Sequence, residues 1–205
     1  MQIGAPKLNI LMKTFTRLWS VSLVVGLGVT LVSTMLGQTN QANPFDARSL
    51  APFIPTPLEV VDRMLQLGDV SSRDTVYDLG SGDGRIVITA AQRYGAKAVG
   101  VELNADLAKR TQARIKELYI ADRAKVVEGD VMDVDLSEAS VVTLYFLSSS
   151  NMKLRPKLEN NLKPGTRVVS HDFGIFGWTP VKTETFQHES RTHTIFVYRV
   201  GRNGP

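Results

Sequence analysis

Apolar residues recur along the middle of the chain at two spacings, and each spacing predicts a different element. Short apolar runs bounded by turn-forming residues predict strands, because buried parallel strands are apolar on both faces. Runs with apolar residues three or four positions apart predict helices that pack one face on a sheet. The predicted strands are 76–79, 98–101, 125–129, 141–146 and 166–170. The predicted helices are 57–65, 85–94, 105–119 and 154–162.

The end of the chain follows a third pattern. Trp178 to Phe186 and Thr192 to Val200 alternate between apolar and polar side chains, which predicts two antiparallel strands. Strands that alternate with helices and then end in such a pair predict an α/β fold, a Rossmann-like, doubly wound sheet of seven strands. Ligands of such sheets bind at the carboxyl ends of the first strands, so we expect a crevice there.

The first predicted helix has a recognisable start. Pro55, Thr56 and Pro57 precede its apolar residues, and Glu59 follows. We expect Thr56 to be the N-cap, Pro57 to occupy the first turn and Glu59 to complete a capping box. The helix should pack on the sheet and place its N-terminal turn beside the crevice.

Three glycines separate the first predicted strand from the helix 85–94, which Gly95 ends. Glycine suits such a loop for two reasons. The chain must turn sharply out of the strand, and its backbone can approach a ligand with no Cβ in the way. The loop therefore predicts a nucleotide-cofactor site. The alternative is a tight turn without a ligand.

The spacing of the loop separates two cofactor classes. Dinucleotide sites have the pattern G-x-G-x-x-G, whereas here the third glycine, Gly84, comes one position early and Arg85 takes its place. Asp78, just before the loop, would repel a pyrophosphate but could accept a hydrogen bond from the ammonium of an amino-acid group. The pattern therefore favours S-adenosylmethionine over NAD.

Two more acidic residues support this interpretation. Glu102 ends the second predicted strand and Asp130 follows the third. Because the carboxyl ends of parallel strands meet at one edge of a sheet, these residues and Asp78 should lie together. We expect Glu102 to bind the ribose hydroxyls and Asp130 to accept from the adenine amino group. The predicted cofactor-binding residues are Thr56, Asp78, Gly80, Ser81, Gly82, Glu102, Leu103, Asp130 and Val131.

Composition excludes several classes of function. The 205 residues include no cysteine, which rules out disulfides, thiolate metal sites and a cysteine nucleophile. The net charge is +4, but residues 1–45 contribute +3, so the remainder carries +1. A nearly neutral domain offers no evident surface for phosphates, so we expect no nucleic-acid partner. No histidine, aspartate and glutamate residues have metal-ligand spacing, and we expect no metal.

The N-terminal part differs from the rest. Residues 1–17 are polar and basic, and the stretch from Trp19 to Gln38 carries no charge. This stretch is long enough for a marginal membrane span. It also resembles a cleaved signal or transit segment, and a buried helix of the globular domain is a third alternative. The predicted divisions are an anchor or signal segment (1–42), a linker (43–54) and an α/β domain (55–201).

A membrane anchor raises the question of which side the domain faces. Basic residues before the span predict that the domain lies outside, whereas S-adenosylmethionine is an intracellular metabolite. Three charges are a modest bias. We therefore expect a membrane-anchored protein whose catalytic domain lies on the side that contains S-adenosylmethionine.

The motifs together resemble the class I, seven-β-strand methyltransferases. More specifically, they resemble the family that includes the mitochondrial lysine N-methyltransferases of the ATP synthase c-subunit and the adenine nucleotide translocase, together with bacterial relatives. The similarity covers about residues 52–200, and those proteins also carry an N-terminal hydrophobic segment. The strings that carry it are 55–57, 77–86, 100–104, 142–145 and 165–171.

The resemblance implies S-adenosylmethionine as cofactor and a protein lysine as acceptor, with a membrane protein as the candidate partner. A lysine nucleophile must be neutral, and an apolar, aromatic channel disfavours its charged form. Tyr145, after the fourth predicted strand, is the candidate wall and hydrogen-bond acceptor. His171, together with Asp172 after it, is the candidate for orienting the substrate or acting as a base. Phe173 and Trp178 could line the same channel, with core packing as the alternative.

Other features bear on the acceptor. Ser148 to Ser150 follow the fourth strand, where the family would have a proline- or acid-containing stretch, which leaves the substrate pocket open. Enzymes that methylate base amino groups use an Asp/Asn-Pro-Pro-aromatic turn there, whereas this chain has Leu144 to Leu147, Leu-Tyr-Phe-Leu. The alternatives to a lysine methyltransferase are methylation of a small or lipophilic molecule, a non-catalytic cofactor-binding scaffold and an NAD-dependent oxidoreductase.

Overall fold

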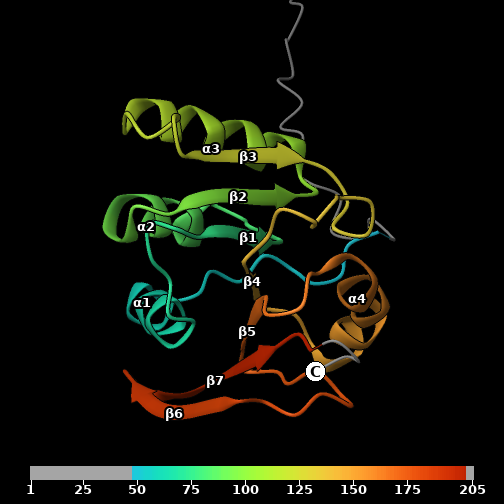
Figure 1. Ribbon diagram of the computed structural model, residues 1–205. Coiled ribbons are helices and arrows are strands. Elements are labelled where there is room, and N and C mark those ends of the chain that lie inside the picture. The colour runs from blue at the N-terminus through green and yellow to red at the C-terminus, as the bar shows by residue number, and fades with distance from the viewer. Residues whose placement is uncertain (1–47, 202–205) are drawn as a thin grey trace, which may run out of the picture. The chain divides into compact units, whose positions relative to one another are not determined.

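The computed structural model describes residues 48–201, which form a seven-stranded sheet in the order β3-β2-β1-β4-β5-β7-β6 (Figure 1). The strands are β1 (Thr75–Leu79), β2 (Lys97–Glu102), β3 (Ala124–Glu128), β4 (Val141–Leu144), β5 (Arg167–His171), β6 (Lys182–His188) and β7 (Arg191–Arg199). The first five are parallel, and β7 runs antiparallel to both β5 and β6. The predicted α/β fold with a closing antiparallel pair is confirmed.

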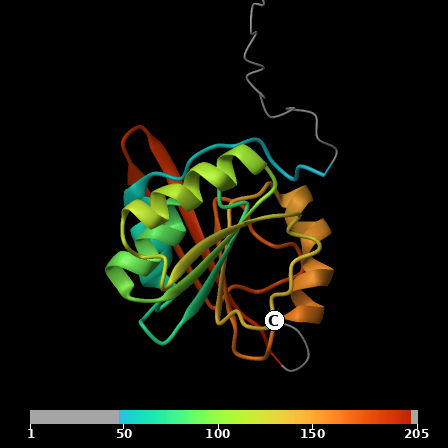
Figure 2. The same ribbon diagram turned by 90° about the horizontal axis from the view of Figure 1, so that it is seen from above.

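Helices cover both faces of the sheet (Figure 2). They are α1 (Leu58–Leu67), α2 (Arg85–Tyr94), α3 (Ala105–Glu117) and α4 (Ser148–Asn161). The first three pack on one face, where Val60 and Ile115 belong to one hydrophobic core. The fourth packs on the other face, where Leu154 and Leu158 belong to a second core. Strands covered on both sides bury every residue, as β4 does, and this explains their continuous apolar sequences.

Two helix boundaries follow the predicted local signals. The chain leaves α2 through Gly95 at φ 66°, a left-handed conformation that favours glycine. Asn104 caps α3, and its side-chain oxygen accepts a hydrogen bond from the Leu107 backbone N–H at 3.0 Å. Strands β1 and β2 are parallel neighbours. The loops that lead from β1 to α2 and from β2 to α3 therefore meet at the same edge of the sheet.

The predicted capping box before α1 is wrong. The helix begins at Leu58 after Pro57, and no side chain caps it. The Thr56 hydroxyl lies 3.4 Å from His171 Nδ1, and Glu59 pairs with His188 of the edge strand β6. Both polar groups therefore form tertiary contacts, which local sequence spacing cannot reveal.

Other boundaries differ from the predictions by short lengths. The strand predicted from Trp178 begins only at Lys182, because residues 175–178 form a turn in which the Trp178 N–H donates to the Ile175 carbonyl. Helix α4 begins at Ser148, before the predicted start at residue 154, so Ser148 to Ser150 form its first turn. Strand β4 ends at Leu144, so Tyr145 and Phe146 are free of the ladder and lie in the loop above the sheet.

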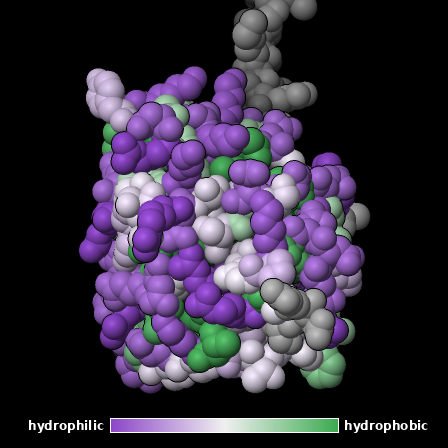
Figure 3. Space-filling view, in the orientation of Figure 1, coloured by the Kyte–Doolittle hydropathy of each residue, from purple (hydrophilic) through white to green (hydrophobic). Residues whose placement is uncertain are grey.

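The predicted segment 1–42, its hydrophobic helix and the linker up to residue 47 lie outside the described residues. Within residues 48–201, none of the helices combines the length and the apolar character needed to cross a bilayer. The face shown in Figure 3 is largely hydrophilic, with small separate hydrophobic patches.

Candidate functional site

A cleft of about 710 Å³ lies at the carboxyl ends of β1, β2 and β4. Cavities of this size hold cofactors and small substrates. Its walls come from segments that are far apart in the sequence but that the sheet topology brings to one edge. They are residues 48–56, 78–83, 85–86, 102–107, 130–131 and 145–146.

The glycine loop forms the floor of the cleft. Gly80 and Gly82 have φ values of 74° and 53°, where only glycine is unstrained. A Cβ on Gly80 would come within 2.9 Å of Phe146, and a Cβ on Gly82 within 2.4 Å of Phe53. The backbone N–H groups of Gly80 and Ser81 both donate to the Val101 carbonyl at 2.9 Å. The loop is thus packed tightly against β2 and has no room for a side chain at Gly80 or Gly82.

A strap, residues 48–56, borders the cleft on the side of α1. Arg85, at the start of α2, donates from Nη1 to the Thr56 carbonyl at 2.6 Å. At the other end of the strap, Ser150 Oγ donates to the Leu50 carbonyl at 2.5 Å. These two bonds join the strap to helices on opposite faces of the sheet, so the strap is tied down at both ends.

Asp78 is the most perturbed acid of the cleft. Its side chain is only 4% exposed and accepts a hydrogen bond from Thr143 Oγ1 at 2.7 Å. Burial is the main cause that raises the pKa of Asp78 to about 7; the Thr143 bond opposes the rise, and the nearby Glu102 and Asp83 carboxylates add to it. A buried carboxyl of this kind is stabilised in its charged form when a cation binds next to it.

Ser81 provides a second unsatisfied group beside Asp78. Its hydroxyl is buried and has no hydrogen-bond partner within the described part of the chain. The hydroxyl lies where a Cβ on Gly100 would be, only 2.5 Å away, so β2 needs glycine at that position. An orphaned buried hydroxyl next to a buried carboxyl fits a ligand that carries N–H or O–H donors. The amino-acid end of S-adenosylmethionine has an ammonium group of this type.

Glu102 connects two loops at the end of β2. One carboxylate oxygen accepts from the Gly82 N–H at 2.7 Å, and the other accepts from the Asn104 N–H at 2.9 Å. Each carboxylate oxygen has a second lone pair. Glu102 can therefore hold the glycine loop in place and still accept hydroxyl donors such as those of a ribose.

The predicted adenine end lies after β3. Asp130 and Val131 line the cleft together with Leu103, and Asp130 Oδ1 accepts from the Met132 N–H at 2.8 Å. The structure thus brings all nine predicted cofactor-binding residues to one cleft. They are Thr56, Asp78, Gly80, Ser81, Gly82, Glu102, Leu103, Asp130 and Val131. Their individual contacts with a cofactor stay predictions.

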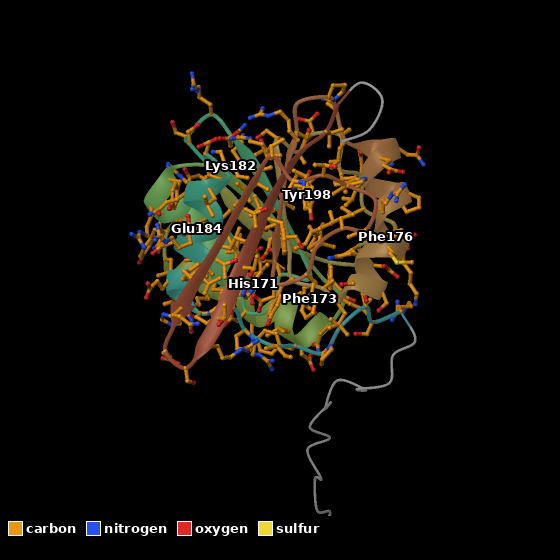
Figure 4. The ribbon with its side chains drawn as sticks, turned by 90° about the horizontal axis from the view of Figure 1, so that it is seen from below. His171, Phe173, Phe176, Lys182, Glu184 and Tyr198 are labelled. Atoms are coloured by element: carbon orange, nitrogen blue, oxygen red, sulfur yellow. The ribbon has the colours of Figure 1, made fainter. Side chains whose placement is uncertain are left out.

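Aromatic rings form the wall beside the strap. The Tyr145 ring lines the cleft, stacks on Phe173 with centroids 6.2 Å apart and lies 4.0 Å from the His171 ring. Figure 4 shows His171 and Phe173 at the same end of the sheet, behind β7. Trp178 is elsewhere: it is buried in the second core against Tyr198 and donates to Glu159. Core packing is therefore the role of Trp178.

His171 lies behind Tyr145 and does not line the cleft. Its side chain is completely buried, and Nδ1 faces the Thr56 hydroxyl at 3.4 Å. Burial is the main cause that lowers the pKa of His171 to about 4; Asp172 opposes the shift, and His193 and Arg191 add to it. His171 is therefore neutral at physiological pH and reaches the cleft only through Thr56 and Tyr145.

Two side chains contact His171: Asp172, which the sequence already placed with it, and His193, which the sequence patterns did not predict. His193 Nδ1 lies 2.9 Å from His171 Nε2, and Asp172 Oδ2 lies 3.3 Å from the same nitrogen. The three side chains form a cluster, although their sequence spacing suggested none, because β7 pairs with β5 and brings His193 across. Only the register of that pair could have revealed it. The prediction that the protein binds no metal stays a prediction.

Comparison with known proteins identifies relatives of this architecture. A family model described as the ANTKMT methyltransferase domain matches residues 78–182. A protein-lysine N-methyltransferase of Saccharolobus islandicus is 48% identical over 153 residues, which are 74% of this chain and 95% of that protein. The human lysine N-methyltransferase of the ATP synthase c-subunit is 32% identical over 162 residues, covering 79% of this chain and 69% of the human protein.

A solved structure agrees with the fold but carries a different name. It is described as an RNA methyltransferase from Salinibacter ruber in complex with S-adenosyl-L-homocysteine. It is 49% identical, covers 74% of this chain and 97% of its own, and has a TM-score of 0.69. The bound molecule is the product that S-adenosylmethionine leaves after methyl transfer. The two relatives with almost half their residues identical thus share the chemistry and differ in the named acceptor.

Proposed function

The chain belongs to the ANTKMT methyltransferase family and uses S-adenosylmethionine, and from this premise we propose that its methyl acceptor is a lysine side chain of a protein. The observation that carries the proposal is the 48% identity with a protein-lysine N-methyltransferase over 95% of that relative's length. The human relative, more distant, is also named for a lysine acceptor. Agreement between relatives at two such distances favours an acceptor that the family shares.

The residues of the cleft fit S-adenosylmethionine from end to end. Asp78 and the orphaned Ser81 hydroxyl would hold the ammonium end, Glu102 the ribose and Asp130 the adenine. The bound cofactor supplies an electrophilic methyl group on a sulfonium. Transfer is an in-line displacement, so the protein has to align the acceptor with that methyl group and keep water out.

The aromatic wall suits an amine acceptor. Lysine in water has a pKa of about 10.4 and is almost entirely protonated, whereas only the neutral amine can attack. The ring of Tyr145 lines the cleft, with Phe173 stacked against it, and an aromatic ring there disfavours full hydration of a charged amine. Tyr145 also carries a hydroxyl group, which is the candidate hydrogen-bond acceptor for the amine.

RNA is the competing acceptor, because of the name of the Salinibacter ruber relative. Two features of this chain favour protein. Residues after position 45 carry a net charge of only +1, whereas RNA binding draws on phosphate contacts. The loop after β4 reads Leu-Tyr-Phe-Leu from Leu144 to Leu147, without the prolines that hold a flipped base in amino-methylating enzymes.

The acceptor is tested by transfer of radiolabelled methyl from S-adenosylmethionine to a cell extract by the full-length chain. The proposal predicts label that protease releases, that nuclease leaves in place and that acid hydrolysis recovers as methyl-lysine. Label that nuclease removes would overturn the proposal in favour of RNA. Label that enters only the organic phase would move the acceptor to a lipophilic molecule.

A matched pair of variants shows that the label comes from the cleft. Asp78→Ala removes the buried carboxyl and should abolish transfer. Asp133→Ala removes an exposed carboxyl that lies outside the cleft lining and should leave transfer unchanged. Transfer that survives Asp78→Ala would mean that another part of the chain holds the cofactor.

We also propose that the enzyme acts beside a membrane, with its domain on the side that contains S-adenosylmethionine. The uncharged stretch from Trp19 to Gln38 supports an anchor. Large apolar side chains at the cleft mouth add support, since Phe53 and Ile54 of the strap are each more than half exposed. Such side chains suit an apolar neighbour better than water.

Flotation with lipid vesicles tests the membrane proposal. The full-length chain should rise with the vesicles, and a chain that begins at residue 43 should stay in the dense fraction. A full-length chain that stays in the dense fraction would contradict an anchor, and so would a mature protein from cells that begins near residue 42. The second result would identify a cleaved signal or transit segment.

A further inference from the structure

The cluster behind the aromatic wall contains more polar groups than core packing requires. Thr56, His171, Asp172 and His193 come from the strap, the end of β5, the following residue and β7. The His171 and His193 side chains are buried, and Asp172 is 13% exposed. Because Thr56 lines the cleft, the cluster connects a cleft surface to an interior network.

The protonation of His171 can be worked out from its neighbours. A neutral imidazole carries one N–H and one bare nitrogen. Asp172 Oδ1 already accepts from the Thr194 N–H at 2.9 Å, so Oδ2 is the oxygen that faces His171 Nε2. Oδ2 also lies 3.5 Å from His193 Nδ1, but its shorter contact, 3.3 Å, is to His171 Nε2. A carboxylate only accepts, so the shorter contact places the ring proton on His171 Nε2. Nδ1 is then bare and must accept.

Thr56 supplies the donor for that bare nitrogen. The Thr56 hydroxyl lies 3.4 Å from His171 Nδ1, and a hydroxyl has a single proton to give. Once the proton points to His171, only the lone pairs of the oxygen are left for the cleft. His171 and Asp172 thereby set the orientation of the Thr56 hydroxyl. A carboxylate sets the tautomer of histidine in hydrolase triads in the same way.

A shared metal ion would require a different geometry. The His171 and His193 ring centroids lie 5.0 Å apart, and the two facing nitrogens lie 2.9 Å apart. The centroid distance exceeds the nitrogen distance by about the radii of the two rings. The rings therefore point at each other nearly end to end, as in an N–H···N hydrogen bond. Rings that bind one metal would instead converge on a third point. The His171 Nε2–H group thus donates a hydrogen bond that His193 Nδ1 and Asp172 Oδ2 share.

The geometry points to a hydroxyl lock: Asp172, His171 and His193 hold Thr56 as a hydrogen-bond acceptor that faces the cleft and binds the N–H groups of an ammonium or amine. Two sources supply such groups, the amino-acid end of S-adenosylmethionine and the acceptor lysine; the second source rests on the proposed function. Thr56 touches the ligand, and the other three are positioning residues.

Charged neighbours do not disturb the lock. Arg191 lies 3.6 Å from Asp172 Oδ2 and is largely exposed. His188 has its ring 6.2 Å from that of His193 and is hydrogen-bonded to Glu59. On the cleft side, the Tyr145 ring covers His171. Asp172 thus keeps its role as acceptor.

Nuclear magnetic resonance of the ¹⁵N-labelled full-length chain reads the tautomer directly. The lock predicts the Nε2–H form of His171, unchanged from about pH 5.5 to about pH 8. The Nδ1–H form would overturn the proposal, and that form is also expected if a metal occupied Nε2. Activity that is lost on dialysis against a chelator and restored by Zn²⁺ would overturn it as well.

Asp172→Asn inverts the lock while keeping its shape. The amide oxygen should keep the Thr194 N–H bond, which turns the NH₂ group toward His171 Nε2. His171 should then switch to Nδ1–H, and the Thr56 proton should point into the cleft against the N–H groups of the ligand. Asparagine tolerates the φ of 58° found at this position, so the backbone need not change.

The matched control is Asp69→Asn. Asp69 also has a positive φ, 50°, but it is exposed and pairs with Lys182 on the far side of the sheet. It should leave the tautomer, cofactor affinity and methyl transfer unchanged. Thr56→Ser keeps the hydroxyl and should keep the Nε2–H form of His171, whereas Thr56→Val removes the hydroxyl and should match the loss in Asp172→Asn.

Two measurements on Asp172→Asn separate the sources of the N–H groups. A rise in the S-adenosylmethionine Kd of about 10- to 100-fold by calorimetry would assign the Thr56 oxygen to the cofactor ammonium. An unchanged Kd with slower methyl-lysine formation at saturating cofactor would assign it to the lysine. A switched tautomer with neither change would overturn the lock. The tautomer and the Kd do not depend on the acceptor, so a wild-type chain that makes no methyl-lysine refutes only the proposed function.

Discussion

Single residues explain how the cleft distinguishes its ligand. Asp78 is buried without full compensation, which raises its pKa to about 7, and the buried Ser81 hydroxyl beside it is unpartnered within the described residues. Such groups destabilise the empty cleft and are satisfied by a bound ammonium. Burying these two groups lowers the stability of the empty fold, and a bound cation offsets that cost, which increases its affinity.

The affinity for S-adenosylmethionine should therefore depend on pH through Asp78. Above about pH 7 the carboxyl is ionised before and after binding, so affinity is at its maximum. A bound ammonium lowers the pKa, so below pH 7 binding must release a proton, and affinity should fall by up to about tenfold per pH unit. Calorimetry between about pH 5 and about pH 8 measures this.

Asp78→Asn is the control for that pH dependence. The amide does not titrate, so the variant should bind weakly at every pH with a flat profile. A wild-type affinity that stays constant, or that rises as the pH falls, would contradict the raised pKa of Asp78.

Residues near a strand end could be predicted from sequence, and residues that meet through the closing strands could not. Asp78 and Glu102 lie next to each other because parallel strands end at one edge, which any doubly wound sheet guarantees. His193 meets His171 only because β7 pairs with β5 in one register. Alternation predicts the strand but not its register.

At the scale of elements, the strap of residues 48–56 belongs to no helix or strand. The bonds to Ser150 and Arg85 are two of the contacts that hold it. Local patterns explained α2 and α3, whose caps are formed by neighbouring residues. They failed at the strap, where Thr56 uses its hydroxyl for His171 and its carbonyl for Arg85.

Arg85→Gln should loosen the strap and weaken cofactor binding. The guanidinium bond to the Thr56 carbonyl is charge-assisted, and its loss should raise the S-adenosylmethionine Kd by about tenfold. Arg123→Gln, which removes an exposed guanidinium paired with Asp122, is the control and should have no effect. Equal affinity in wild type and Arg85→Gln would mean that the strap does not shape the cofactor site.

At the scale of the whole molecule, charge distribution bears on the acceptor. Most of the net charge of +4 lies in residues 1–45, and the rest of the chain is nearly neutral. Electrostatic attraction to a polyanion therefore has little to act on in the α/β domain. A protein acceptor held by apolar and aromatic contacts needs no such attraction.

Salt should accordingly have little influence on the reaction. Methyl-lysine formation should change less than about twofold between about 50 mM and about 200 mM salt, because no counterions are released on binding. An RNA acceptor held by several phosphate contacts would lose about 10³-fold in affinity over the same range. A steep loss of rate would therefore contradict the protein acceptor.

The most direct test of the central claim is the position of a transferred deuterated methyl group. The full-length chain is incubated with an extract and methyl-deuterated S-adenosylmethionine, and peptides and nucleosides are then separated and analysed by mass spectrometry. A lysine acceptor predicts the deuterated methyl on lysine side chains, absent with Asp78→Ala. Deuterated methyl on nucleosides, with none on lysine, would contradict it.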